Sequence, residues 1–345
     1  MTEAEQKMLE ELHGEIARLK SRAEDEWRTG VSMRLDHIAG EVADLKVCLQ
    51  KTSPTLGHTY VTRWSVKKLL VKLIPNLLKP ALRNIDSFRI DTIDRLKNRH
   101  SMIPPKSMVS VGGGDFGEIG QEFKGHFINL ANLQPHNRVL DVGCGNGRMA
   151  VPLTSYLSRQ GEYWGFDIVN EGIEWCQCNI SQKFSNFHFQ HSDVYNKRYN
   201  PNGKIRAQDF QFPYDAESFD FAFLTSVFTH MLPADLEHYL SEVARVLKTG
   251  GQCLITYFIM NEEAENLLRV DPSTRDIWHE IEGCLTLNEE FPEAAGVAYR
   301  EDTVKQLFEK YGLKIIRPIH YGKWCKRTNW LSYQDIIIAA KEKSH

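Results

Sequence analysis

The chain has 345 residues, of which 42% are hydrophobic and 25% charged, and its formal net charge at pH 7 is −3. These values are typical of a globular protein with one large or two modest domains. No nucleic-acid partner is expected, because nucleic-acid binding needs a concentrated basic surface. No run approaches the ~20 apolar residues that span a bilayer. The seven cysteines form no CxxC pair, so we expect free thiols and a cytoplasmic protein.

Residues 1–50 show the spacing of a coiled coil. Their apolar side chains recur alternately every three and four positions, at Leu9, Leu12, Ile16 and Leu19 and again at Leu35, Ile38, Val42, Leu45 and Leu49. This seam favours two helical segments of about two heptads each, which are marginal as isolated dimers. Two interpretations stay open: self-association or docking to a partner, and a helical hairpin folded against the rest of the chain.

A second N-terminal region, residues 51–105, connects this helical segment to the rest of the chain. Over residues 61–100 it is basic, and its apolar stripe is interrupted by Pro75 and Pro80, each of which ends or kinks a helix. A basic amphipathic helix suits peripheral contact with an anionic membrane, but more often such a helix presents a solvated basic face above an apolar packing face. Both interpretations stay open.

The segment Arg138–Arg148, which reads RVLDVGCGNGR, predicts the centre of the fold. It begins with an apolar run that is typical of a strand buried on both faces. Gly143, Gly145 and Gly147 then alternate before a helical pattern begins. Because glycine has no Cβ, such a turn lets the backbone approach a ligand closely. The order of strand, glycine turn and helix places that ligand at the carboxyl end of a central parallel strand.

An acidic residue, Asp141, comes two positions before the first glycine. A dinucleotide-binding turn has the spacing G-x-G-x-x-G, whereas this one reads D-x-G-x-G-x-G, and a carboxylate suits an ammonium group better than a phosphate. The stretch resembles motif I of the class I S-adenosylmethionine-dependent methyltransferases. The resemblance implies S-adenosylmethionine as the cofactor, bound by Asp141, by the three glycines and by Cys144 and Asn146. The glycine spacing disfavours the alternative of an NAD-dependent oxidoreductase.

Two further acidic residues stand at the ends of later predicted strands. Asp167 ends the second strand about 20 residues beyond the glycine turn, where a carboxylate accepts hydrogen bonds from ribose hydroxyls. It matches the ribose-binding acid of the family. The resemblance also implies that Asp193 accepts the adenine amino group and that Val194 packs on the adenine ring. Ile168 and Thr225 are further cofactor contacts that it implies.

From Arg138 onward, strand patterns alternate with helical ones, which predicts a doubly wound α/β domain. We expect strands at residues 138–142, 162–168, 186–190, 219–224, 252–258, 313–319 and 334–340. Helices are expected at residues 118–133, 147–158, 170–183, 233–246 and 302–311. The resemblance covers residues 106–345, and it implies a seven-stranded, mostly parallel sheet that ends in a reversed hairpin. The N-terminal α-helical region precedes this domain as an extension.

Two stretches are unusual for connections between these elements. Residues 259–301 are too long for a simple connection, and their many Glu and Asp residues predict an acidic lid over the substrate, suited to a polyol or a cationic acceptor. Tyr195–Gln211 is polar and contains Pro201 and Gly203, so we expect a surface loop there.

Methyl transfer from a sulfonium is an in-line displacement, so the enzyme mainly aligns the reacting atoms and excludes water. An oxygen acceptor gains from a general base, and an imidazole suits this role near neutral pH. His230 follows the fourth predicted strand, at the end where the acceptor approaches. It is therefore the candidate catalytic residue, with substrate positioning or a structural hydrogen bond as alternatives. The reaction needs no metal, and no metal site is expected.

Aromatic and basic residues on two other segments are the candidate contacts of the acceptor. Phe116 follows a glycine run, and His320, Tyr321 and Trp324 follow the sixth predicted strand, where aromatic faces suit sugar rings and planar groups. We predict O-methylation of a small molecule or a glycan. The alternatives are N- or C-methylation of a small molecule, and a scaffolding protein that acts through its coiled coil with a non-catalytic methyltransferase domain.

Overall fold

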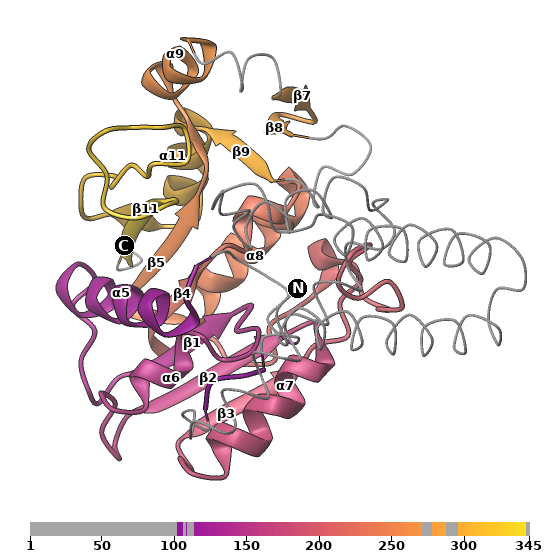
Figure 1. Ribbon diagram of the computed structural model, residues 1–345, viewed down its shortest axis with the longest axis vertical. Helices are drawn as coiled ribbons and strands as arrows, with labels where there is room; N and C mark the ends of the chain where they lie inside the picture. The colour runs from indigo at the N-terminus through magenta and orange to yellow at the C-terminus, as the bar shows by residue number, and fades with distance from the viewer. Residues whose placement is uncertain (1–101, 106–107, 109–113, 271–277, 288–295, 343–345) are drawn as a thin grey trace, which may run out of the picture. The chain divides into compact units, whose positions relative to one another are not determined.

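The computed structural model describes residues 102–105, 108, 114–270, 278–287 and 296–342 (Figure 1). All described residues belong to the second of the two units into which the chain divides, Pro80–His345. The predicted coiled coil over residues 1–50 and the basic region over residues 61–100 lie outside the described residues. Self-association, membrane contact and cytoplasmic location therefore stay predictions. Within the described part, no helix combines the length and the apolar character needed to cross a membrane.

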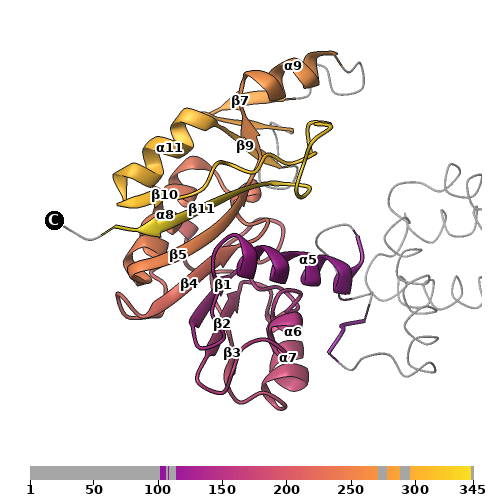
Figure 2. The ribbon, with the colours of Figure 1, turned by 90° about the vertical axis from the view of Figure 1, so that its left-hand side faces the viewer.

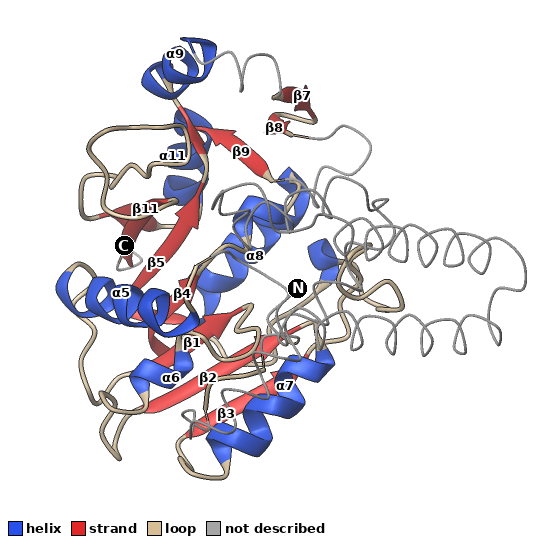
Figure 3. Ribbon diagram, viewed as in Figure 1, coloured by secondary structure: helices blue, strands red, loops and turns tan. Residues whose placement is uncertain are grey.

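The main sheet of the second unit has seven strands, most of which are labelled in Figure 3. They are β1 (Arg138–Val142), β2 (Glu162–Asp167), β3 (Phe187–His191), β4 (Phe219–Leu224), β5 (Leu247–Tyr257), β10 (Leu313–Ile315) and β11 (Asp335–Lys341). Their order across the sheet is β10-β11-β5-β4-β1-β2-β3. The first five strands pair in parallel, whereas β11 runs antiparallel to both β5 and β10. The predicted mostly parallel sheet with a reversed final hairpin is confirmed.

Helices cover both faces of this sheet (Figure 2). They are α5 (Phe116–Asn129), α6 (Ala150–Leu153), α7 (Asn170–Cys176, continued by a π turn over Gln177–Ser181), α8 (Pro233–Val246) and α11 (Glu301–Lys310). The first three pack on one face, and α8 and α11 pack on the other. Successive strand residues point to opposite faces, so in β11 the side chains of Ile336 and Ile338 enter one core while Ile337 and Ala339 enter the other.

The helix predicted over residues 147–158 is shorter in the structure. Only Ala150–Leu153 is α-helical, and the chain continues as turns. The Thr154 hydroxyl donates to the Val151 carbonyl oxygen at 2.6 Å, and the Ser155 hydroxyl donates to the Pro152 carbonyl oxygen at 2.9 Å. Such local side-chain bonds compete with regular helical hydrogen bonds, so the periodicity alone overestimated the length of this helix.

The stretch over residues 259–301 builds a small second sheet instead of a simple connection. Its strands are β6 (Ile259–Met260), β7 (His279–Ile281), β8 (Cys284–Thr286) and β9 (Val297–Arg300), in the order β6-β9-β8-β7, and α9 (Glu262–Val270) follows β6. A separate apolar core holds this insert together, formed by Met260, Ala264, Leu268, Ala298 and Cys325. The insert is therefore packed partly by its own residues and partly by Cys325 of the segment before β11, and its Ile259, Cys284, Val297 and Tyr299 belong to the main core.

Candidate active site

A cavity of about 1010 Å³ opens at the carboxyl ends of the central strands. Its lining comes from the start of α5, the glycine turn after β1, the end of β2, the segment after β3, the segment after β4, the start of α8, and residues 323–334 before β11. Sites for one small molecule span roughly 300–1000 Å³, so this cavity is large enough for a cofactor and an acceptor together. In open α/β sheets, ligands bind at this end of the strands.

The glycine turn has a backbone that only glycine adopts without strain. Gly143, Gly145 and Gly147 have φ values of +78°, +51° and +77°. A Cβ on Gly143 would lie 2.6 Å from Val227 Cγ2, and one on Gly147 would lie 2.8 Å from Ile180 Cδ1, so both positions are also too crowded for a side chain. A Cβ on Gly145 would meet nothing within 4 Å, because this part of the turn faces the open cavity.

Asp141 places an unsatisfied carboxylate oxygen beside this turn. Its side chain is buried, and the Tyr163 hydroxyl donates to Oδ2 at 2.5 Å. Among the described residues, Oδ1 has no hydrogen-bond partner. Burial raises the pKa of Asp141 from 3.8 to about 8, although the hydrogen bond from Tyr163 opposes the rise. Buried polar atoms are normally paired, so this oxygen fits a cationic group of a ligand, such as an ammonium.

Asp167 connects the end of β2 to the glycine turn. Its Oδ2 accepts a hydrogen bond from Gly145 N and its Oδ1 accepts one from Val169 N, both at 2.8 Å. Burial raises the pKa of this carboxyl, and these backbone donors oppose the rise. Each carboxylate oxygen has a second lone pair. Because Asp167 lines the cavity, these free lone pairs suit the two hydroxyls of a ribose.

Asp167→Ala should weaken the binding of S-adenosylhomocysteine by about 1–3 kcal/mol, the scale of a lost hydrogen bond to a charged group. The loss has two sources, because the variant removes the acceptor and also releases Gly145 N. Calorimetric titration of the full-length protein measures it, with Asp302→Ala, an exposed acid in α11, as the control. Unchanged affinity in Asp167→Ala would refute the ribose assignment.

The predicted adenine contacts are divided between the cavity and its surroundings. Val194 and Ile168 line the cavity, as do Cys144, Asn146 and Thr225 of the predicted cofactor set. Asp193 is not part of the lining: its side chain is 41% exposed and forms an ion pair with Lys204 at 3.6 Å. Its contact with the adenine amino group stays a prediction.

The segment after β4 brings His230 into the cavity. His230 ends a short 3-10 helix, Phe228–His230, and lines the cavity together with Ser226. Its backbone N donates to the Val227 carbonyl oxygen at 2.9 Å. Ser226 has a φ of +62°, and Thr256 Oγ1 accepts a hydrogen bond from its backbone N at 2.7 Å. A left-handed backbone at a residue other than glycine is uncommon and is often found at functional sites.

The polar stretch after β3, expected to be a surface loop, forms a wall of the cavity. Its lining residues are Tyr195, Asn196, Tyr199, Arg206, Ala207 and Gln208. Asn196 Oδ1 accepts hydrogen bonds from the backbone N of Arg198 and Tyr199, at 2.9 and 3.0 Å. A Cβ on Gly203 would lie 2.5 Å from the Val194 backbone. Asn and Gly are common in ordered turns, so Asn196 and Gly203 were sequence signals that this segment is an ordered turn.

Of the predicted acceptor contacts, Phe116 lines the cavity, whereas His320, Tyr321 and Trp324 lie elsewhere. Trp324 Nε1 donates to Oδ2 of the buried Asp335 at 2.7 Å, which turns the indole toward the core of the insert. His320 pairs with the β11 residue Ile336 through its backbone.

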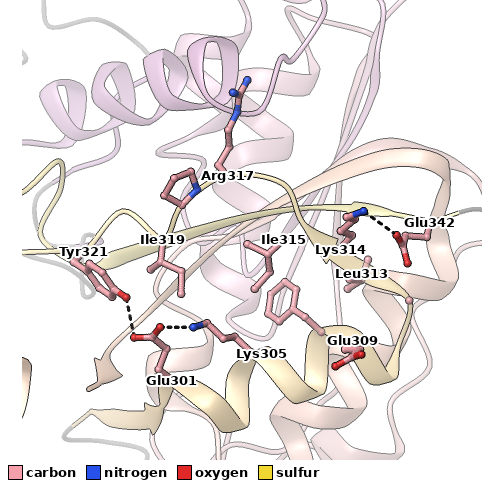
Figure 4. Close-up of a pocket in the computed structure, with 13 residues that line it drawn as sticks. Glu301, Lys305, Glu309, Leu313, Lys314, Ile315, Arg317, Ile319, Tyr321 and Glu342 are labelled. Carbon is pink, nitrogen blue, oxygen red and sulfur yellow. Dashed lines mark hydrogen bonds and ion pairs between the residues drawn. The ribbon is translucent and has the colours of Figure 1, made fainter. Parts of the chain in front are cut away.

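Tyr321 lies in a separate groove of about 570 Å³ between α11 and residues 313–319 (Figure 4). There its hydroxyl donates to Glu301 Oε2 at 2.8 Å. The residues before β11 that line the main cavity are Lys323, Trp330, Ser332, Tyr333 and Gln334. The predicted segment therefore reaches the cavity, but through residues other than those predicted.

Several acidic residues of the insert form ion pairs with arginines in the described part. Arg300 forms ion pairs with Glu265 at 3.0 Å and with Glu280 at 3.4 Å, and Arg327 forms one with Glu263 at 2.8 Å. No described residue of 259–301 lines the cavity. The expected acidic lid, and the preference for a cationic acceptor that it implied, therefore have no support from these residues. Nor do the described residues contain a cluster of His, Cys, Asp or Glu arranged to hold a metal.

Comparison with known proteins relates this geometry to a family. Residues 133–312, just over half of the chain, match the methyltransferase-domain family. An uncharacterized methyltransferase of Bacillus subtilis, YcgJ, is 28% identical over 209 residues, which are 59% of this chain and 70% of that protein. A fatty-acid O-methyltransferase of Mycolicibacterium smegmatis is 35% identical over 122 residues, which are 34% of this chain and 36% of that enzyme.

A human relative and two solved structures are also similar. The mitochondrial ubiquinone biosynthesis O-methyltransferase of Homo sapiens is 26% identical over 217 residues, so the chain spans 52% of it. The crystal structure of YcgJ is 20% identical, with a TM-score of 0.40, and covers 64% of this chain and 98% of its own.

The Burkholderia thailandensis 1,6-didemethyltoxoflavin-N1-methyltransferase, solved with S-adenosylhomocysteine, is 14% identical with a TM-score of 0.40 and covers 84% of this chain and 94% of its own. Both structural likenesses are distant, and the family match carries the assignment. The chain belongs to the methyltransferase-domain family, and it is an enzyme whose cofactor is S-adenosylmethionine.

Proposed function

We propose that this enzyme methylates a hydroxyl oxygen of a small molecule or a glycan. The observation that carries the proposal is the position of His230, an imidazole that lines the cavity at the carboxyl end of β4, beside Ser226. An oxygen acceptor must lose its proton as it attacks, and an imidazole is suited to take that proton. Two of the relatives described above are named as O-methyltransferases, which adds support.

The cofactor half of the cavity fits S-adenosylmethionine in its donor and acceptor groups. The unpartnered Oδ1 of Asp141 would hold the ammonium group, and Asp167 would hold the ribose hydroxyls. Val194 and Ile168 would flank the adenine ring, and the open face at Gly145 leaves room for the chain of the cofactor. When bound, S-adenosylmethionine supplies a methyl group activated by its sulfonium.

The protein contributes alignment, exclusion of water and removal of a proton. Phe116, Ile119 and Val227 give the cavity an apolar lining near its glycine turn and β4 segment. Holding the acceptor oxygen in line with the methyl group makes the reaction effectively unimolecular, which lowers its barrier. His230 would accept the hydroxyl proton as the oxygen attacks. Removal of this proton is the acid–base step that methyl transfer to oxygen requires.

The test uses the full-length enzyme, S-adenosylmethionine with a labelled methyl group, and a panel of phenols, sugars and amines. The expected product carries the label on oxygen, and the proton and carbon NMR shifts of the new methyl group identify the atom. A label on nitrogen or carbon would replace the proposal with the N- or C-methylation alternative. Cofactor binding without transfer to any acceptor, phenol, sugar or amine, would favour the scaffolding alternative.

A further inference from the structure

The order of the strands divides the cavity into two halves. The glycine turn, Asp141 and Asp167 lie at the ends of β1 and β2, on the side of the sheet that ends in β3. β4, β5 and β11 lie on the other side. Residues 323–334 come directly before β11, so they border the half of the cavity that the cofactor leaves to the acceptor. This inference rests on the proposed function of that same site.

Exposed aromatic side chains are concentrated around the cavity. In the described part of the chain, the exposed aromatic residues are Tyr195, Trp330 and Tyr333, at 46%, 47% and 56% exposure, and all three line it. Trp330 and Tyr333 are on the acceptor side. Exposed apolar surface that gathers at one place commonly marks a ligand-binding groove. Aromatic faces there suit an acceptor that contains a ring.

Lys323 places a positive charge on the same aromatic surface. Its Nζ lies 4.2 Å from the centre of the Trp330 ring, and it has no ion-pair partner among the residues that the structure describes. Glu122, an acid of the lining that contacts the same segment, forms its contacts with other residues: its Oε1 accepts the Ser332 hydroxyl at 2.5 Å and lies 3.4 Å from His126 Nε2. Lys323 is therefore a cation available to a ligand.

The segment that carries Lys323 and Trp330 is held in place by hydrogen bonds at both of its ends. Lys323 N donates to the Ser332 carbonyl oxygen at 3.2 Å, which closes the segment on itself. The buried Asp335 accepts from Gly322 N at 2.6 Å, and Gln334 Nε2 donates to Ser226 Oγ at 2.9 Å. A surface fixed before binding loses little entropy when a ligand arrives. Such a surface is suited to recognition.

We propose that the acceptor is an anionic compound with a hydroxyl-bearing ring, whose negative group pairs with Lys323 while its ring packs on Trp330. The negative group would be a carboxylate or a phosphate. The hydroxyl that receives the methyl group would lie deeper, toward His230. Charge and ring together distinguish such an acceptor from a neutral sugar or alcohol, which would gain only the aromatic contact.

The experiment compares matched pairs of acceptors on the full-length enzyme. The pairs are protocatechuate with its primary amide, and D-glucuronate with D-glucose, so that aromatic and sugar rings are tested separately. We expect kcat/KM for the anionic member of at least one pair to exceed that of its neutral partner about tenfold, as a hydrogen bond to a charged group implies. Equal rates within both pairs would overturn the proposal.

Variants of Lys323 then test whether this residue causes the preference for anionic acceptors. Lys323→Gln should lower kcat/KM for the anion about tenfold and leave the neutral partner unchanged, whereas Lys323→Arg should keep the preference. Lys314→Gln, which removes a lysine paired with Glu342 outside the cavity, is the control and should change neither. A loss that affects both members equally in Lys323→Gln would contradict the assignment.

Binding separates a failure of this inference from a failure of the proposed function. Calorimetric titration of the enzyme loaded with S-adenosylhomocysteine measures acceptor binding without transfer. Preferential binding of an anion that depends on Lys323 supports the inference even where methylation is found on nitrogen or carbon. If the loaded enzyme binds none of the four compounds, and the enzyme supplied with S-adenosylmethionine methylates none of them, the inference is overturned, while O-methylation of other acceptors is still open to the wider panel.

Discussion

Asp141→Asn is expected to stabilise the cofactor-free protein and to remove most of its affinity for S-adenosylmethionine. The carboxyl has a pKa of about 8 in the folded protein, against an ordinary value of 3.8. Between these two pH values the unfolded chain releases the proton that the folded protein keeps, so stability falls as pH rises through this window. An asparagine does not titrate, and its amide oxygen still accepts a hydrogen bond from Tyr163. The variant therefore removes this pH-dependent loss of stability.

We expect a gain of about 1–3 kcal/mol in the free energy of unfolding at pH 8, the scale of an unsatisfied buried polar group. Chemical denaturation of the cofactor-free protein at pH 5 and pH 8 measures it. The gain should be larger at pH 8 because the unfolded wild-type chain releases this proton above pH 3.8, whereas the folded protein keeps it up to about pH 8, so the loss of stability accumulates over that range. If the variant is less stable than wild type at both pH values, burial of the Asp141 carboxyl does not destabilise the folded protein, and the explanation is wrong.

The same substitution should weaken the binding of S-adenosylmethionine about 10- to 100-fold, as loss of a hydrogen bond between charged groups predicts. Calorimetric titration of the two proteins at pH 8 provides the measurement. A protein that gains stability and loses its ligand by one change would identify Asp141 as a group kept for binding. Retained affinity would mean that the ammonium is held elsewhere.

His230→Ala is the second substitution with a large expected effect. Turnover should fall about 100-fold or more, the usual contribution of a general base, while the affinity for S-adenosylhomocysteine stays unchanged. His320→Ala is the matched control, because His320 was also predicted to face the substrate but lies outside the cavity lining. Initial rates of methyl transfer measure both variants.

Three outcomes for His230 are distinguishable. A rate that falls in His230→Ala and loses its dependence on pH supports a base. A raised KM with an unchanged kcat would make His230 a positioning residue. An unchanged rate would assign it a structural role and would remove the main support for an oxygen acceptor.

The sheet could be predicted from the sequence because its strands are marked by local patterns. The apolar run before Gly143 and the acid that ends β2 fixed the positions of β1, β2 and the turn between them. The order of the final strands followed from the family resemblance and not from the pattern itself. Helix length was less predictable, because the hydroxyls of Thr154 and Ser155 compete with the helical bonds.

The cofactor half of the site was more predictable than the acceptor half, for a physical reason. Asp141 and Asp167 stand at strand ends, where a parallel sheet brings residues together whatever the loops do. The acceptor side depends on which residues of one loop face inward. Here Trp324 donates a hydrogen bond to Asp335 and does not line the cavity, whereas its neighbour Lys323 does. Trp324 and Asp335 are 11 positions apart across an irregular segment, where no local periodicity predicts which side chains meet.

Asp335 connects the loop that borders the acceptor to the small second sheet, which matters for exchanging these segments between enzymes. One of its carboxylate oxygens accepts from Gly322 N, and the other accepts both from Trp324 Nε1 and from Ile259 N, at the first residue of the insert. The loop that borders the acceptor and the small sheet are thus anchored to a single carboxylate. In a chimera with another methyltransferase, the two segments should be exchanged together as one cassette, since a transplanted loop without its insert would lose the hydrogen bonds of Arg327 to Glu263 and Asn261.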